Sequence, residues 1–183
     1  MASDGTDNSA GDEQTPQNYL SEGERGRVVR WQDPLIGARA GRKLAGHDYL
    51  QAWIDGALPI PPIAELMGFA LVEVGDGRAV FRCAPGEYHY NPNGAVHGGL
   101  AATLLDSAMG CAIHTKLPAG IGYTTLELKV NYIRPLTSTT GIVTSEGKVI
   151  HLGSTIATAE GRITGAAGKL YAHATTTCLI LRS

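Results

Sequence analysis

One stretch of the chain constrains its fold more than any other. From Val96 to Ile113 the sequence is apolar on nearly every side and contains no proline, and Lys116-Leu117-Pro118 closes it. The helical spacing of its apolar residues predicts one helix over about residues 96–114, roughly 28 Å long at ~1.5 Å per residue. Because apolar side chains occupy all of its faces, this helix is predicted to be buried on most sides.

A single carboxylate interrupts this apolar stretch. Asp106 is the only acidic residue between Asn91 and Thr115, and no Lys or Arg lies there either. A charged group in apolar surroundings is costly unless it is bonded or has a chemical task. Two interpretations are therefore open: a carboxylate bonded locally or turned to water, and a catalytic carboxylate.

Polar residues precede the helix and continue to its start. Asn91 and its neighbours form a turn-rich run, and His97-Gly98-Gly99 follows at the expected first turn. The N–H groups of a helix start lack intrahelical partners, and the helix dipole favours negative charge there. Glycine lets another molecule approach the backbone, so a free N–H on Gly98 could donate to a developing oxyanion. A plain loop-to-helix junction is the alternative explanation.

The spacing of these groups limits how they can cooperate. Gly98 and Asp106 are eight residues apart, about 12 Å along one helix, so no single carbonyl carbon can lie within ~3 Å of both. If the two act together, they come from different chains, as in a two-fold dimer with antiparallel helices. An enzymatic interpretation therefore predicts an obligate homodimer with two equivalent sites at its interface.

The rest of the chain predicts an antiparallel sheet. Within residues 125–132, alternation places Leu126, Leu128, Val130 and Tyr132 on a buried face, and the intervening residues from Thr125 on a wet one. Such a sheet, wrapped around one helix, gives an α+β domain. Strands are predicted at residues 69–74, 78–84, 125–132, 141–151, 154–164 and 169–181.

The N-terminal third of the chain is predicted to contain a tail and an extension. Residues 1–18 contain no Val, Ile, Leu, Phe or Trp and only acidic charges, which predicts a disordered tail. Residues 19–60 are predicted to form an extension, and residues 61–183 the main domain. The extension has a basic segment that is extended up to Pro34 and an amphipathic helix at 47–58, and one or two helical turns at 63–67 follow at the start of the main domain. Its basic segment could contact ligand phosphates or be a solvated segment that packs Trp31 on the domain, and the extension could cover one mouth of a binding site or the outer sheet face.

Composition excludes several classes of partner. A formal net charge of −2 gives no reason to expect nucleic acid or an anionic membrane, and no apolar run of about 18 residues is present. Without a signal-peptide pattern, a cytoplasmic location is expected. Three scattered cysteines and six dispersed histidines predict neither disulfides nor a metal site, and no cofactor is expected.

An ordered set of residues resembles a known family. Asn91, His97-Gly98-Gly99, Asp106, and a strand from Thr125 that ends in Arg134-Pro135 are similar to hotdog-fold acyl-CoA thioesterases of the phenylacetate-degradation type. The resemblance covers about residues 61–181. It implies the hotdog fold and hydrolysis of an acyl-CoA thioester to free acid and coenzyme A, in a homodimer that often pairs into a homotetramer. Chain length excludes a double hotdog.

The resemblance also implies roles for individual residues. Gly98 N–H and the Asn91 amide would polarise the thioester carbonyl. Asp106 of the partner chain would activate water as general base or attack as nucleophile. Thr125 of that same partner chain would help to hold the water. His97 would shape the helix start or bond the ligand.

Some assignments have close rivals. Gly99 and Thr124 are assigned to substrate binding, but Thr124 could take the place of Thr125, and Asn93 that of Asn91. A hotdog dehydratase is disfavoured because the histidine of that group stands in a Pro-Gly-His-Pro-like context, which is missing here. A non-catalytic acyl-CoA-binding or sensing module and a purely structural dimer are the remaining alternatives.

Overall fold

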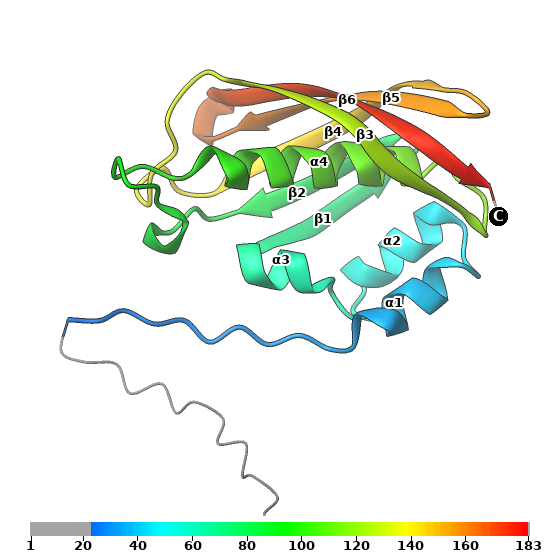
Figure 1. The fold of residues 1–183 in the computed structure, drawn as a ribbon, viewed down its shortest axis with the longest axis horizontal. Helices are drawn as coiled ribbons and strands as arrows, with labels where there is room; N and C mark the ends of the chain where they lie inside the picture. Colours follow the sequence, from blue (N-terminus) through cyan, green and yellow to red (C-terminus); the bar gives the residue numbers. More distant parts are fainter. Residues whose placement is uncertain (1–22, 183) are drawn as a thin grey trace, which may run out of the picture.

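The fold is one antiparallel sheet wrapped around a long helix. The computed structural model describes residues 23–182, so the acidic tail predicted at residues 1–18 lies outside the described residues. A six-stranded sheet surrounds helix α4 (Gly98–His114), and three short helices lie before it in the chain (Figure 1). This arrangement confirms the predicted α+β hotdog architecture.

The sheet has the order β1-β2-β4-β5-β6-β3, with every neighbouring pair antiparallel, so β1 and β3 are its edges. All six predicted strands are present, with ends that shift by a few residues. The β1–β2 hairpin turns at Gly77, whose positive φ of 73° suits glycine. The strands are β1 (Phe69–Gly75), β2 (Arg78–Cys83), β3 (Ile121–Tyr132), β4 (Val143–Leu152), β5 (Ile156–Thr164) and β6 (Leu170–Arg182).

Helix α4 occupies the centre of the core, as its all-round apolar pattern predicts. Leu104, Leu105 and Met109 are fully buried. At Gly147 the sheet touches the helix backbone, because a Cβ there would lie 2.3 Å from the carbonyl oxygen of Ala108. The helix begins two residues later than predicted, since Val96 instead pairs with Tyr90 in an isolated bridge.

Strand β3 departs from the predicted alternation. It begins at Ile121, earlier than predicted, and its pairing with β6 shifts register between Thr125 and Glu127. The buried positions therefore change parity at this β-bulge: Leu128 and Val130 pack against the core, whereas Leu126 is 57% exposed. The prediction that Leu126 and Tyr132 are buried is wrong, and so is the prediction of a wet Thr125. The extra residue turns Thr125 towards α4.

The extension forms more helix than predicted. Helix α1 (Pro34–Gly41) was not expected: Asp33 caps it with a side-chain bond to the Leu35 N–H, and proline occupies its first position. The predicted extended piece therefore stops at Pro34 because a helix starts there. Helix α2 (Gly46–Ile54) is shorter than predicted, and α3 (Pro62–Met67) ends at Gly68 in a left-handed conformation. Helices α2 and α3 both contact β1 (Figure 1).

Candidate active site

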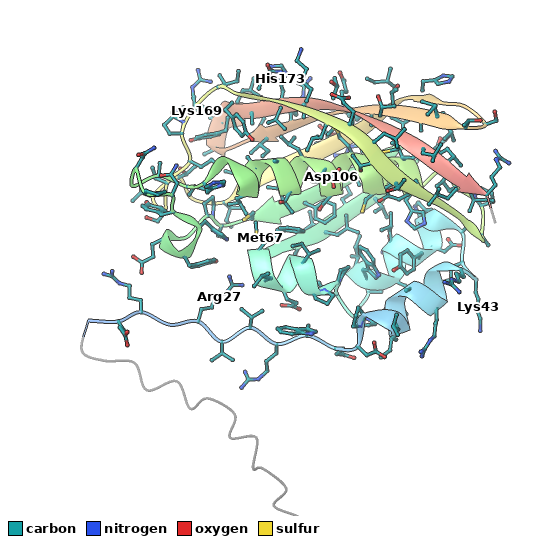
Figure 2. The ribbon with its side chains drawn as sticks, viewed as in Figure 1. Arg27, Lys43, Met67, Asp106, Lys169 and His173 are labelled. Atoms are coloured by element: carbon teal, nitrogen blue, oxygen red, sulfur yellow. The ribbon has the colours of Figure 1, made fainter. Side chains whose placement is uncertain are left out.

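Asp106 has one close hydrogen-bonding partner of the same chain. The Thr125 hydroxyl donates to Asp106 Oδ1 at 2.9 Å, and both side chains are partly buried. Figure 2 shows Asp106 in the central part of α4, beside β3. One carboxylate oxygen is thereby fixed, and among residues 23–182 no donor engages Oδ2, which is left for another molecule.

The carboxylate opens into an apolar cavity of about 250 Å³. Asp106, Ser107 and Thr125 are its polar residues, at one part of its lining. The remainder is aromatic and aliphatic, with no Lys, Arg or His among the described lining residues. It comes from α2, the segment through α3, β1, β2, α4 and β3: Trp53, Ile60, Pro61, Ile63, Ala64, Phe69, Ala70, Leu71, Phe81, Cys111 and Tyr123.

The start of α4 presents a free backbone donor. His97 is the N-cap, and its Nδ1 accepts the Gly99 N–H at 2.8 Å. Gly98 is the first helical residue, and its N–H has no acceptor within the described part of the chain. The Gly99 N–H, assigned to substrate binding from the sequence, is already taken by His97. Tyr132 lies over Gly98 and donates its hydroxyl to the Gly98 carbonyl at 3.2 Å.

Asn91, in the loop before α4, lines the same cavity as Gly98. Its Oδ1 accepts the N–H groups of Asn93 at 2.9 Å and Ala95 at 3.3 Å. The carboxamide oxygen is therefore used within the turn, and its NH₂ group can donate elsewhere. Asn91, His97 and Gly98 line a second cavity, of about 320 Å³. Thr124, by contrast, is exposed and lines neither cavity.

The two groups of residues stay apart within one chain. The cavity at the helix start and the cavity at Asp106 share no lining residue. One chain brings together Asp106 with Thr125, and Asn91 with His97 and Gly98, but it does not bring these two sets together. Sequence reasoning missed Tyr132 and Trp53 as lining residues, because it treated both only as packing residues of a strand and of a helix.

Comparison with known proteins places this arrangement in a family. The model of the thioesterase superfamily matches residues 93–172. Two relatives, both named provisionally as esterases, are each 33% identical: one from Halobacterium salinarum over 103 residues and one from Saccharolobus solfataricus over 121 residues. The matches cover 54% and 66% of this chain, and 66% and 84% of those proteins, respectively. The chain belongs to the thioesterase superfamily.

Solved structures of this superfamily share the fold. A protein from Ralstonia eutropha, named provisionally as a thioesterase and described as phenylacetic acid degradation-related, has a TM-score of 0.65 and 26% identity, covering 72% of this chain and 98% of that one. A protein from Bacillus halodurans, solved with CoA, has a TM-score of 0.61 and 32% identity, covering 68% and 81%. The expected hotdog thioesterase family is thus confirmed.

The superfamily match does not extend over the whole candidate site. Residues 93–172 include Gly98, Asp106 and Thr125, but neither Asn91 nor any residue of α1, α2 and α3. The part of the wall around Asp106 that α2 and α3 supply therefore lies outside the matched residues.

The groups nearest to Asp106 are neutral. Burial raises the pKa of the Cys111 thiol to about 12, and the charge of Asp106 adds to this rise. Burial likewise raises the pKa of Tyr123 well above its ordinary value. Neither group is an available nucleophile or base near neutral pH, so Asp106 is the candidate for that role among the residues that line the cavity.

Two kinds of feature are absent from residues 23–182. No cluster of three or more His, Cys, Asp and Glu side chains there could hold a metal ion. Nor does the described part of this thioesterase-superfamily chain contain a helix with the length and hydropathy needed to cross a membrane.

Proposed function

We propose that the protein hydrolyses acyl-CoA thioesters to a free acid and coenzyme A. The observation that carries this proposal is the Asp106 carboxylate, bonded to Thr125 on one oxygen and open on the other to an apolar cavity. Such a cavity suits the acyl chain, and the free oxygen suits a water molecule. The CoA held by the Bacillus halodurans relative supports coenzyme A as the thiol portion of the substrate.

The reaction follows from the two sets of residues. Water attacks the thioester carbonyl carbon and gives its proton to Asp106, so that a C–O bond forms and the carbonyl becomes an oxyanion. Gly98 N–H and the Asn91 NH₂ donate hydrogen bonds to that oxyanion. Such hydrogen bonds are usually the largest single contribution to stabilising the transition state. The oxyanion then collapses, the C–S bond breaks, and the coenzyme A sulfur takes the proton. If Asp106 attacks instead, the C–S bond breaks as a mixed anhydride forms, and coenzyme A leaves as a thiolate that takes a proton from solvent. Water then cleaves the anhydride to the free acid and the Asp106 carboxylate.

The active site is proposed to be shared by two chains. Gly98 and Asp106 lie on one rigid helix, about 12 Å apart. An antiparallel arrangement of two α4 helices about a two-fold axis would place Gly98 of each chain near Asp106 of the other. This homodimer contains two equivalent sites, and a homotetramer would be a pair of such dimers.

Hydrolysis of an acyl-CoA panel tests the activity. Free thiol release is followed for acetyl to palmitoyl, phenylacetyl and benzoyl esters, with wild type beside Asp106→Ala and Asp106→Asn. We expect both variants to lose about 10²–10⁴-fold in kcat, the range for a removed general base. Near-wild-type turnover in both would disprove the role of Asp106. Binding of the esters without turnover by the wild type would favour the alternative function, an acyl-CoA-sensing module.

A single-turnover reaction in ¹⁸O-water separates the two roles of Asp106. With enzyme in excess, a general base delivers the label only to the released acid. A nucleophilic carboxylate instead acquires label when water cleaves the anhydride at its own carbonyl, and mass analysis of the peptide containing Asp106 detects it.

A further inference from the structure

The cavity at Asp106 has a roof, which comes from α2 and the segment through α3. Its floor is α4, and the edge strands β1 and β3 flank it. Trp53 of α2, together with Ile60 and Ile63 around α3, completes the lining. The roof therefore closes the opening between the two edges of the sheet, where the wrapped sheet does not cover α4.

The size of the cavity limits what it can hold. From Asp106 it extends along α4 as far as Cys111, five residues or roughly 7.5 Å. Its volume is about 250 Å³. A dry protein cavity of about 150 Å³ takes one benzene ring, so this one has room for about one ring with a short arm, or about eight aliphatic carbons.

The roof is anchored firmly at the α2 end. Gly46 donates its N–H to the Leu117 carbonyl at 2.9 Å, and a Cβ on Gly46 would lie only 1.8 Å from the His114 carbonyl oxygen. Tyr49 then packs edge-on against Trp53, with ring centroids 5.0 Å apart, and against His114 at 5.4 Å. Helix α2 is thus fixed to the end of α4, which holds Trp53 in place.

The roof is also anchored at the α3 end. Arg27 donates to the carbonyl oxygens of Glu65 at 2.5 Å and Leu66 at 3.0 Å, at the carboxyl end of α3. Its guanidinium lies 4.4 Å from the centre of the Tyr88 ring. Figure 2 shows Arg27 on the extended segment below α3, near Met67. A roof held at both ends cannot easily withdraw to admit a longer chain.

We propose that this roof determines acyl specificity: Trp53 and Ile63 confine the substrate to compact acyl groups of up to about eight carbons or one ring. The inference rests on the proposed function, because it takes the cavity at Asp106 as the acyl site. It assigns the selection of the substrate to α2 and α3, which lie outside the residues that the superfamily model matches.

The test compares straight-chain acyl-CoA esters from acetyl to palmitoyl. For the full chain, kcat/KM should rise by up to about fourfold per added methylene, the gain from burying a CH₂ group, as far as about octanoyl. It should then fall, with palmitoyl at least tenfold poorer than octanoyl. Trp53→Ala and Ile63→Ala should each raise the palmitoyl-to-octanoyl ratio, by about tenfold for the tryptophan.

Leu66→Ala is the matched control. Leu66 and Ile63 are both on α3 and are similarly exposed, at 55% and 48%, but only Ile63 lines the cavity. The ratio should therefore not change in Leu66→Ala. If Trp53→Ala does not fold, Ile63→Ala alone tests the proposal. Because the Ile63 side chain is half exposed, its removal should leave the fold intact.

Binding measurements separate this inference from the proposed function. Calorimetric titration of the same esters into Asp106→Asn reports length selectivity without turnover. One outcome is that the wild type hydrolyses none of the esters while Ile63→Ala changes the acyl-length selectivity of binding. That result would overturn the proposed thioesterase function but support the role of the roof in acyl selection. Hydrolysis or binding of palmitoyl-CoA as good as that of octanoyl-CoA in the wild type would overturn the roof while the thioesterase stands.

Discussion

The two ends of helix α4 use glycine for opposite purposes. At the start, Gly98 keeps the backbone accessible: a Cβ there would meet only the Tyr132 ring, at 3.2 Å, and its N–H has no acceptor in residues 23–182. At the other end, Gly46 of α2 lets two backbones touch, and a Cβ would be 1.8 Å from the His114 carbonyl oxygen. The first end is left open, whereas the second is sealed.

The contrast gives the two ends of α4 different roles: the start is available to a ligand, and the far end stabilises the fold. The open end offers a donor to a ligand, and the sealed end fixes the extension whose roof covers the Asp106 cavity. Substitutions at the start should therefore change catalysis while the fold persists. Substitutions at the far end should change the free energy of unfolding first.

Among substitutions at the two ends of α4, the largest effect is expected from removing the Gly98 N–H. Gly98→Pro deletes this donor at the first helical position, where proline is well tolerated, and the extended ψ of 135° at His97 suits a following proline. Loss of one oxyanion donor should lower kcat by about 10²–10³-fold. Gly98→Ala adds a Cβ but keeps the N–H, so it should retain most of the turnover. Equal losses in the two variants would contradict the donor role.

Mixing two inactive variants tests whether a site is shared. In a dimer of one Gly98→Pro chain and one Asp106→Asn chain, one of the two sites receives both intact residues. Random reassociation of equal amounts yields about half mixed dimers, so activity should recover to about a quarter of wild type. Refolding each variant alone is the control. No recovery, with mixed dimers demonstrated by mass, would exclude a shared site.

At the sealed end the expected effect is on stability. Gly46→Ala forces a methyl group into the His114 backbone, so the helices must separate. Overpacking of this kind costs about 1–3 kcal/mol, and a backbone clash should be at the upper part of that range. Urea unfolding measures the change. Gly56→Ala provides a comparison, because no atom lies within 4 Å of its added Cβ, although the positive φ of 71° adds some strain.

A smaller effect is expected from Thr125. Thr125→Val keeps the shape but loses the hydroxyl that donates to Asp106, and a hydrogen bond to a charged group contributes about 1.5–3 kcal/mol. If that bond orients the carboxylate in the transition state, kcat should fall by about 10- to 100-fold. Thr125→Ser should restore it. The exposed Thr124→Val should have no effect, and a loss there instead would reverse the assignment of the two threonines.

The fold was predictable because its main signals are local. The all-round apolar pattern of residues 96–113, the hairpin at Gly77 and the strand-forming segments each reflect nearby residues, and all appear in the structure. The bulge after Thr125 was not predictable, since an inserted residue is defined only by the register with β6. Helix α1 left a signal, Asp33-Pro34, that was interpreted only as a stop.

The candidate site was less accessible to sequence reasoning. The Thr125–Asp106 bond joins residues that the resemblance had already paired, but Trp53 enters the same cavity from more than fifty residues away. Only the packing of α2 on the end of α4 brings it there. Likewise, the capping bond that occupies the Gly99 N–H depends on the His97 rotamer. Contacts set by tertiary packing have no periodic pattern in the sequence.

The smallest predicted effect is the dependence of stability on pH, which involves His114 at the sealed end of α4. Burial lowers the pKa of His114, at the end of α4, and that of His89, whose Nδ1 accepts the Gly86 N–H. Both rings are therefore harder to protonate in the folded state than in the unfolded state. Their contribution to stability is fully present above the unfolded pKa of about 6.5 and is lost as pH falls through the lowered folded values. The unfolding midpoint in urea should thus decrease from pH 7.5 to pH 5.

A non-titrating ring at position 114 sharpens this prediction. His114 packs between Tyr49 and Tyr123, with ring centroids 5.4 and 5.5 Å away, so His114→Phe preserves an aromatic ring without a titrating nitrogen. The decrease in midpoint between pH 7.5 and pH 5 should become smaller in this variant, with the remainder due to His89 and the carboxylates. An unchanged decrease would mean that acid weakens the protein elsewhere. The seal between α2 and α4 would then not depend on a neutral His114.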